Sequence, residues 1–481
     1  MRKAILQPLF RATAAILFLA PAADAQLRRE APPALSDAEF WQVFSKMSEF
    51  GGSFPSENFV SNEVSFQYPI PTLQKTVRPD GVYLGVGPEQ NFTYIANLKP
   101  RLAIIFDIRR QNAMAHLMYK ALFELSPTRA EFVSRLFSRP LAGRVATTAR
   151  VDDLFAVTSA AARSDSAFDA NQRAVFAHLV GKHRFTLTPG DSAAIEHLLQ
   201  VFYEAGPEIN YGYRLGRGVQ FTSTYPNYGL LQTRTNMDSV QMAFLANEDN
   251  YRVVRDMQLR NLIIPVVGNF AGPTAVRAVG EFLKQRSLTV QAFYLSNVEQ
   301  YLFQDGIADE FYRNVATLPL DSTSTFIRSV PPNGGGAFTI SSQMRGMTTI
   351  RSSINGNGVS TTMQMFDSAG YRWMRTSIDS GGGSLTRLYR DSLGVMQLKQ
   401  TDSTRAISSV PMPIVPVPSP NGGIVVPVPA QTYGTPPRVV VGGNLLTSGI
   451  ASMKKTLEAF EAGKASTYRD IIAMTKLDGW R

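Results

Sequence analysis

Apolar residues recur with two spacings along this chain, and the change between the two predicts where strands and helices lie. Four short and nearly continuous apolar runs are typical of parallel strands that are buried on both faces. These runs cover residues 82–84, 102–106, 262–267 and 289–295.

Between residues 111 and 200 the apolar positions recur every three or four residues, which predicts helices. Ser126-Pro127 and Thr188-Pro189 have the pattern of a capping residue followed by a proline in the first turn. Alternating strands and helices predict an α/β fold with a doubly wound, mostly parallel sheet and an extra helical region. The expected helices span residues 111–124, 127–137, 151–163, 168–182 and 190–204.

Helices are also expected near both ends of the chain. Ser36 and Glu39 have the spacing of a capping box, so a helix is expected to begin at residue 37. Helical periodicity returns at residues 448–462, before Gly463, and again near residues 467–474.

The composition changes sharply from residue 331. Residues 337–400 are rich in Ser, Thr and Gly, and their apolar positions recur every second residue, which predicts a small antiparallel β-meander of four or five strands. Residues 410–438 carry proline at nearly every second position in places, which favours an extended polyproline linker.

The first 25 residues have the pattern of an export signal. Arg2 and Lys3 precede an apolar stretch at residues 14–20, and Ala23-Asp24-Ala25 forms a cleavage site. The stretch is too short to span a bilayer. We therefore expect a secreted or periplasmic protein without a transmembrane segment after signal removal, in which residues 26–35 are disordered.

Charge and cysteine content exclude several classes of function. The formal net charge is +10, but no dense Lys/Arg tract accompanies it, so no nucleic-acid partner is expected. The chain of 481 residues has no cysteine, which excludes disulfides, thiolate metal sites and a cysteine nucleophile.

A glycine turn carries the strongest chemical signal. Gly85-Val86-Gly87-Pro88 follows the first apolar run, and Asp107 ends the second. This spacing is typical of a nucleotide-binding βαβ unit, in which the acid accepts from ribose hydroxyls. The third glycine of the dinucleotide motif is missing, which favours a ligand with a ribose and no pyrophosphate, such as S-adenosylmethionine. Glycine pairs also end strands in turns that bind nothing, so a purely structural turn is the alternative.

Five segments together resemble an uncharacterised exported family with a class I S-adenosylmethionine-dependent methyltransferase-like fold. The likeness covers about residues 36–330 and resumes near residues 445–475. It implies that residues 331–443 are an insertion and that the helices of 444–481 return to the α/β domain. The segments are residues 61–63, 85–92, 107–112, 268–273 and 294–299.

The resemblance implies roles for individual residues. Gly85 and Gly87 would lie beneath the methionine end of the cofactor, and Asp107 would lie at the ribose. Asn269 would lie at the tip of the fourth strand, near the methyl acceptor, where many methyltransferases carry an acid. The full cofactor set is Gly85, Gly87, Glu89, Gln90, Asp107, Arg109 and Asn112.

The substrate and catalytic candidates lie in the same segments and in a loop at 206–235 that is rich in aromatic residues. This loop is expected to be functional or to be a packed cover over the sheet. The catalytic candidates are Glu63, Glu89, Asn269 and a tyrosine of the loop. The substrate candidates are Asn62, Asn269, Ser296, Asn297 and Tyr225.

Two functions therefore compete. An exported protein that binds a small molecule or an envelope protein fits the export signal, since S-adenosylmethionine is not expected outside the cell. The alternative is an active S-adenosylmethionine-dependent methyltransferase on an unknown acceptor. No metal is expected, because His178 and His183 are five residues apart and so do not share a face of an α-helix. No G-x-S-x-G motif is present to supply a serine nucleophile.

Overall fold

The core of the molecule is a six-stranded sheet. The computed structural model describes residues 34–54, 56–214, 218–219, 225–330, 347–355, 358–366, 372–378, 384–390, 396–403 and 446–477. From one edge to the other, the strands are β5 (Ile263–Val267), β2 (Leu102–Asp107), β1 (Val82–Val86), β6 (Val290–Ser296), β7 (Leu320–Val330) and β13 (Thr447–Ser452).

Counted along the chain, the strands of this sheet have the order 3-2-1-4-5-6, which is that of a doubly wound α/β fold. The five strands β5, β2, β1, β6 and β7 are parallel, and β13 runs antiparallel to β7. The predicted fold class is therefore confirmed. The strand order reverses between β1 and β6, and ligands of such sheets bind at the carboxyl ends of the strands at this switch point.

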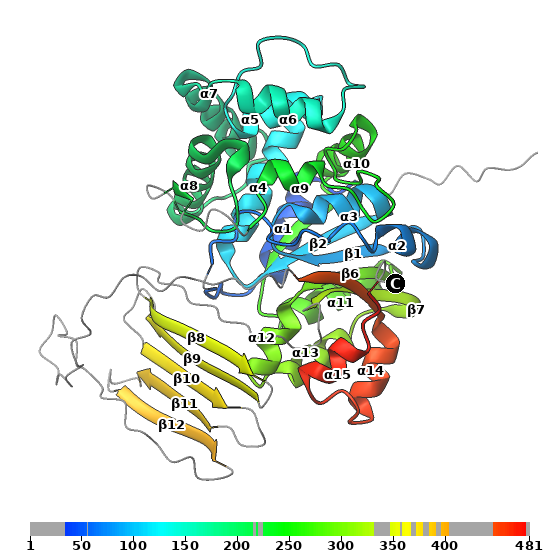
Figure 1. Ribbon diagram of the computed structural model, residues 1–481, viewed down its shortest axis with the longest axis vertical. Coiled ribbons are helices and arrows are strands. Elements are labelled where there is room, and N and C mark those ends of the chain that lie inside the picture. The colour runs from blue at the N-terminus through cyan, green and yellow to red at the C-terminus, as the bar shows by residue number, and fades with distance from the viewer. Residues whose placement is uncertain are drawn as a thin grey trace, which may run out of the picture. The chain divides into compact units, whose positions relative to one another are not determined.

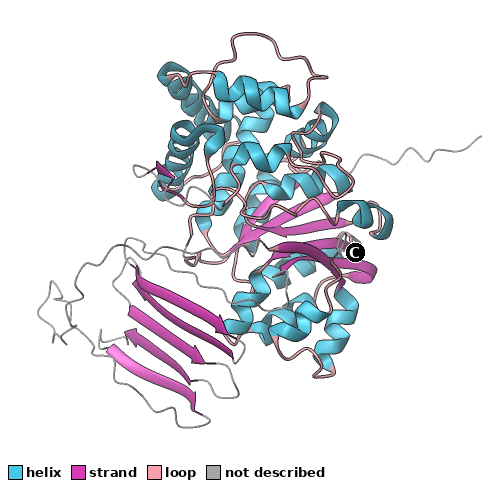
Figure 2. Ribbon diagram, in the orientation of Figure 1, coloured by secondary structure: helices cyan, strands magenta, loops and turns pink. Residues whose placement is uncertain are grey.

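Helices cover both faces of the sheet (Figure 1, Figure 2). The crossovers from β1 to β2 and from β2 to β5 place helices on one face, and the helices after β5 and β6 lie on the other. The first face carries α3 (Gln90–Leu98), α4 (Arg110–Leu125) and α10 (Glu248–Leu259). The second carries α11 (Ala275–Gln285), α12 (Val298–Gln304), α13 (Ala308–Val315), α14 (Met453–Glu461) and α15 (Tyr468–Ala473).

An extra group of helices lies between α4 and α10 in the chain, as predicted. Thr188 caps the helix that begins at Pro189, in a capping box with Asp191, which confirms the Thr188-Pro189 signal. The Ser126-Pro127 signal is wrong, because Thr128 accepts from the N–H of Glu131 and so becomes the cap. These helices are α5 (Arg129–Leu136), α6 (Val151–Ala160), α7 (Asp165–Phe176), α8 (Pro189–Ala205) and α9 (Tyr228–Thr233), the last of which lies within residues 206–235, where only a loop was expected.

The capping box at the start of the domain is confirmed, since Ser36 and Glu39 bond reciprocally at the start of α1 (Asp37–Met47). Before the sheet begins, the chain forms one further short helix, α2 (Ile70–Thr76). No helix in the described part of the chain is both long and apolar enough to cross a membrane.

The prediction that a helix begins at residue 448 is wrong. Residues 447–452 form β13, and α14 begins only at Met453. Within this strand, position 449 has room only for glycine. The backbone of Lys476 passes so close that a Cβ at Gly449 would lie 2.5 Å from the Lys476 carbonyl oxygen. Pairing with β7 on one side and Lys476 on the other therefore outweighs the helical spacing of the apolar residues.

The Ser/Thr/Gly-rich region forms antiparallel strands, as its period-two pattern predicts. Residues 1–33 and 404–445, which include the predicted export signal and polyproline linker, lie outside the described residues. The strands are β8 (Met347–Asn355), β9 (Gly358–Phe366), β10 (Arg372–Ile378), β11 (Ser384–Arg390) and β12 (Met396–Ser403).

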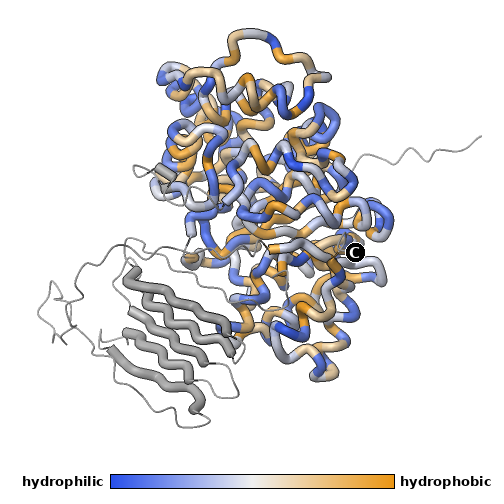
Figure 3. Tube along the Cα trace, viewed as in Figure 1, coloured by the Kyte–Doolittle hydropathy of each residue, from blue (hydrophilic) through white to orange (hydrophobic). Residues whose placement is uncertain are grey.

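Aromatic side chains form much of the core on both faces of the sheet. Hydrophobic segments occur both in the strands and in the helices that cover the sheet (Figure 3). Aromatic pairs of this kind add about 0.5–1.5 kcal/mol each beyond their burial. One face holds Phe106, Phe270, Phe293, Phe311 and Phe326, and the other holds Phe92, Phe123, Phe132, Phe244 and Tyr251.

Candidate functional site

The site predicted from the sequence lies at the switch point, where β1 and β6 end side by side. Two residues with left-handed backbones mark this edge of the sheet. Gly87 follows β1 with φ of 78°, and Ser296 ends β6 with φ of 51°. A positive φ is uncommon for serine, and such residues cluster at functional sites.

The glycine turn after β1 holds a side chain of the protein itself. The Asn91 amide donates to the carbonyls of Val86 at 2.9 Å and Pro88 at 2.7 Å, and its oxygen accepts from the Tyr83 hydroxyl at 2.8 Å. A Cβ on Gly85 would lie 1.9 Å from the Asn91 Oδ1 atom. Glycine is therefore required at position 85 to leave room for the Asn91 side chain, whether or not the turn binds a ligand.

We expect Gly85→Ala to lower the free energy of unfolding by about 1–3 kcal/mol. The new methyl group would overlap the buried Asn91 side chain, which its hydrogen bonds hold in place. Chemical denaturation of the protein without added ligand measures this change. Gly143→Ala is the matched control, since nothing lies within 4 Å of a Cβ at Gly143. Equal stabilities of the two variants would contradict the assignment of Gly85 to packing.

Asp107 ends β2 at the predicted place, but both of its oxygens bind Arg109. Arg109 Nε lies 3.1 Å from Oδ1 and Nη2 lies 2.8 Å from Oδ2, and the Arg109 backbone N–H adds a third bond at 2.8 Å. The same guanidinium donates to the carbonyls of Ser56 and Glu57. Because both side chains are buried, a ribose at Asp107 would have to displace this ion pair.

The expected place of Asn269 at the fourth strand is wrong. Asn269 follows β5, which is the third strand and pairs with β2 at the edge of the sheet. The turn there holds the Glu49 carboxylate, which accepts from the backbone N–H groups of Asn269, Thr274 and Ala275 at 3.1, 2.7 and 2.8 Å. Glu49 thus occupies the start of α11, where an anionic ligand would otherwise be favoured.

The fourth strand, β6, ends beside the candidate acid Glu63. The Glu63 carboxylate accepts from the hydroxyls of Tyr294, at 2.8 Å, Ser296 and Ser329. Burial raises the pKa of Glu63 despite these bonds. Gln90 joins the same network, because its amide donates to the Tyr294 hydroxyl at 3.1 Å. The structure therefore brings three of the candidates, Glu63, Gln90 and Ser296, into one hydrogen-bond network.

The other substrate candidates lie around this network. Asn297 lies at the N-cap position of α12 without a capping bond from its side chain, and its amide donates to Gln300 Oε1 at 3.3 Å. Asn62 is half-buried directly before Glu63. Tyr225 contacts Tyr211 with ring centroids 5.2 Å apart. Both tyrosines are within electrostatic range of Tyr301, next to Asn297, so the aromatic loop reaches the end of β6.

Glu89 is the most unusual candidate at this edge. Its side chain is 1% exposed, and within the described part of the chain no other side chain donates a hydrogen bond to it. The backbone N–H groups of Glu89 and Ser61 favour the charged form of the carboxyl, but less than burial disfavours it. Burial raises the pKa of Glu89 to about 8, so it holds a proton at neutral pH. Buried polar groups without a partner are rare in folded proteins.

One face of α4 carries further unpaired polar atoms, and this face reaches the glycine turn through His116 and Glu89 through Tyr119. Asn112, His116 and Tyr119 share this face. The ring of Phe92, in the first turn of α3, packs against the rings of His116 and Tyr119 with centroid distances of 5.5 and 5.3 Å. Among the described residues, Asn112 Nδ2, His116 Nδ1 and the Tyr119 hydroxyl have no hydrogen-bond partner. Tyr119 is within electrostatic range of Glu89.

His116 has a fixed protonation pattern. Burial lowers its pKa to about 4, so the ring is neutral at pH 7. Its Nε2 lies 2.9 Å from the Gly87 carbonyl oxygen and must donate there. The unpaired Nδ1 is therefore an acceptor, beneath the glycine turn.

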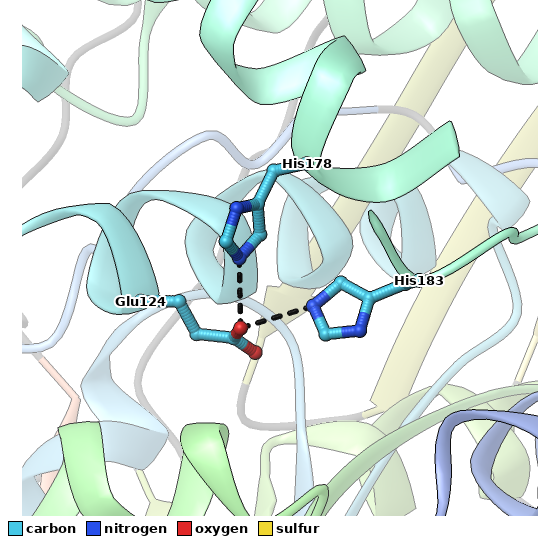
Figure 4. A group of neighbouring side chains, drawn as sticks. All are labelled: Glu124, His178 and His183. Carbon is cyan, nitrogen blue, oxygen red and sulfur yellow. Dashed lines mark hydrogen bonds and ion pairs between the residues drawn. The ribbon is translucent and has the colours of Figure 1, made fainter. Parts of the chain in front are cut away.

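The spacing argument against a histidine cluster is wrong. Residues 177–182 form a π-helix, in which the His183 N–H donates to the His178 carbonyl at 3.0 Å. This wider turn brings residues five apart onto one face, so both rings reach Glu124 (Figure 4). A spacing rule for α-helices cannot find this pair, and the sequence carries no signal for the π-turn that we recognise.

Comparisons with known proteins show which family the chain is in. No curated protein matches it. Among solved structures it is similar to the CcbJ methyltransferase from Streptomyces caelestis, with 17% identity and a TM-score of 0.12; the match covers 32% of this chain and 53% of that one. The model of the family described as "Domain of unknown function (DUF7790)" matches residues 58–186 and 220–366. Since these segments make up more than half of the sequence, the chain belongs to this family.

Proposed function

We propose that this protein is exported and binds a small polar molecule at Glu89, at the switch point of its sheet. The observation that carries the proposal is the Glu89 carboxyl, which is buried without a side-chain partner. Isolating such a group is unfavourable unless a partner compensates it. The signal pattern of residues 1–25 supports export.

The unpaired atoms define the chemistry of the ligand. His116 Nδ1 accepts a hydrogen bond, Asn112 Nδ2 donates one, and Glu89 does both when it is protonated. A molecule that carries several hydroxyl or amino groups supplies donors and acceptors for this set. A purely apolar ligand would leave all of these groups unpaired.

S-adenosylmethionine is the second candidate ligand, and methyl transfer is the second candidate function. One observation favours it, namely the left-handed Gly87 at the switch point between β1 and β6. Against it stand the Asp107–Arg109 ion pair and the Asn91 side chain in the turn. Methyl transfer at this place would require Arg109 to leave Asp107.

Mass spectrometry of small molecules released from the natively purified mature protein tests the proposal. We expect a polar compound in near-stoichiometric amount, and we expect Glu89→Gln to lose most of it. Glu196→Gln, a change at an exposed position of α8, is the matched control and should retain the compound. Wild-type protein that releases no such compound would contradict the proposal.

Isothermal titration with S-adenosylmethionine and S-adenosylhomocysteine separates the two candidates. We expect no heat of binding from either. Saturable binding of either compound that Glu89→Gln leaves unchanged would overturn the first proposal in favour of the methyltransferase.

A further inference from the structure

The side chains of Glu124, His178 and His183 converge on one point between α4 and the π-helix (Figure 4). We propose that these three residues bind a divalent transition-metal ion, with zinc as the first candidate. This site uses different residues from the Glu89 proposal and does not depend on it.

The distances between the donor atoms suit a shared ion. His178 Nε2 lies 2.7 Å from Glu124 Oε2, and His183 Nε2 lies 3.0 Å from the same oxygen. The three ligand atoms all lie within 4.8 Å of one another. Zinc binds imidazole nitrogen and carboxylate oxygen at about 2.0–2.2 Å, so a small outward movement of each donor admits the ion.

The donor set itself is one that proteins use for metals. Two histidines and one glutamate bind zinc in sites that keep a further coordination position open. Two histidines and a carboxylate also bind ferrous iron. The backbone that presents the rings is a π-turn, which is rare in proteins and frequent at functional sites.

Asp37 stands behind His183 as an outer partner. His183 Nδ1 lies 2.8 Å from Asp37 Oδ1, and Asp37 also accepts from the Asn261 amide at 2.8 Å. When a metal occupies Nε2, a neutral imidazole carries its one proton on Nδ1, the nitrogen that lies beside the Asp37 carboxylate. This pairing of carboxylate, histidine and metal orients the ring in many metal sites.

Two lysines complete the surroundings of Glu124. The buried Lys120 ammonium lies 2.6 Å from Oε1 and also donates to the Gln258 carbonyl, so it fixes the carboxylate and leaves Oε2 for the metal. Lys182 is half exposed and lies 2.9 Å from Oε2 and 3.3 Å from His178 Nε2. Its ammonium occupies the place of a cation and is free to swing into solvent.

An ion cluster that only neutralises Glu124 is the competing explanation, and it accounts for Lys120 and Lys182 but not for the two imidazoles. Three further nitrogens, from His178, Lys182 and His183, lie within 3.0 Å of the single oxygen Oε2. A carboxylate oxygen has about two lone pairs for hydrogen bonds. Three nitrogens therefore exceed what Oε2 can accept. Their number is explained if the two imidazoles are present as metal ligands.

Zinc titration of the metal-free full-length mature protein tests the site. We expect one zinc ion per chain by calorimetry, and visible absorption of a four-coordinate ion when cobalt replaces zinc. His178→Ala should lower the zinc affinity at least about 100-fold, and Asp37→Asn should lower it about 10-fold. His197→Ala is the matched control, because His197 also pairs with a glutamate, Glu57, at 2.9 Å but lies outside the cluster.

Lys182→Met keeps all three ligands and removes the competing cation. We expect it to tighten zinc binding about fivefold. This variant keeps the proposal falsifiable even when His178→Ala fails to fold. Absence of stoichiometric zinc binding in the wild type and in Lys182→Met, or equal affinities of His178→Ala and His197→Ala, would overturn the proposal. The mass spectrometry that tests for a small molecule at Glu89 does not depend on whether zinc binds, so the two proposals can fail separately.

Discussion

Asp107→Asn is expected to lower the free energy of unfolding by about 3–5 kcal/mol, since removing one partner leaves the buried Arg109 guanidinium without its counter-charge. Asp107 and Arg109 are 5% and 7% exposed, so water cannot replace the lost carboxylate. Urea denaturation at neutral pH measures the change as a lower midpoint with an unchanged slope.

Asp249→Asn is the matched control for this prediction. Asp249 pairs with Arg252 at 3.4 Å, and its side chain is 92% exposed. Exposed pairs contribute at most about 1 kcal/mol, so this variant should unfold close to the wild type. A stability of Asp107→Asn equal to that of the control would mean that Arg109 does not depend on Asp107.

The result also bears on ligand binding. If Asp107 served chiefly as a ribose acceptor, its substitution would weaken a nucleoside complex and leave the unliganded protein nearly as stable as before. The two hydrogen bonds between Arg109 and Asp107 predict the opposite, namely that the substitution lowers the stability of the unliganded protein.

The sequence located the strands of the switch point but not what fills its turns. The apolar runs predict β1, β2, β5 and β6, because strands buried on both faces are apolar throughout. Asp107 and Gly85 lie where their spacing predicts. Whether the space above a glycine holds a ligand or another side chain depends on contacts that spacing does not contain.

Two turns illustrate this limit. Glu49 reaches the Asn269 turn from more than 200 residues away in the chain, and no local pattern links the two. Asn91 is only six residues from Gly85, so a polar side chain in the first turn of the following helix was a signal that could have been read. Strand β7 and the edge strand β13 were missed because their pairing, rather than their own apolar pattern, makes them strands.

The second large effect is expected from Glu89→Gln, which should stabilise the protein at pH 8 and leave it unchanged near pH 4.5. The ordinary pKa of glutamate is 4.5, and burial raises the pKa of Glu89 to about 8 in the folded protein. Between these values the unfolded chain has lost the proton and the folded chain still holds it, so stability falls as the pH rises. The loss is about 1.4 kcal/mol per pH unit, or about 4 kcal/mol at pH 8.

Glutamine has the shape of protonated glutamate and does not titrate, so it removes this loss. Other carboxyl groups titrate in the wild type and in the variant alike. The difference in free energy of unfolding between the two proteins, compared at pH 5 and pH 8, therefore reports on Glu89 alone. Thermal or urea unfolding at both values measures it, with Glu196→Gln as the control that should show no such difference. An equal effect of Glu89→Gln at pH 5 and pH 8 would mean that Glu89 titrates normally. If the difference appears, Glu89 lowers the stability of the unliganded protein, and a ligand that donates to its carboxylate should raise the stability of the wild type but not that of the variant.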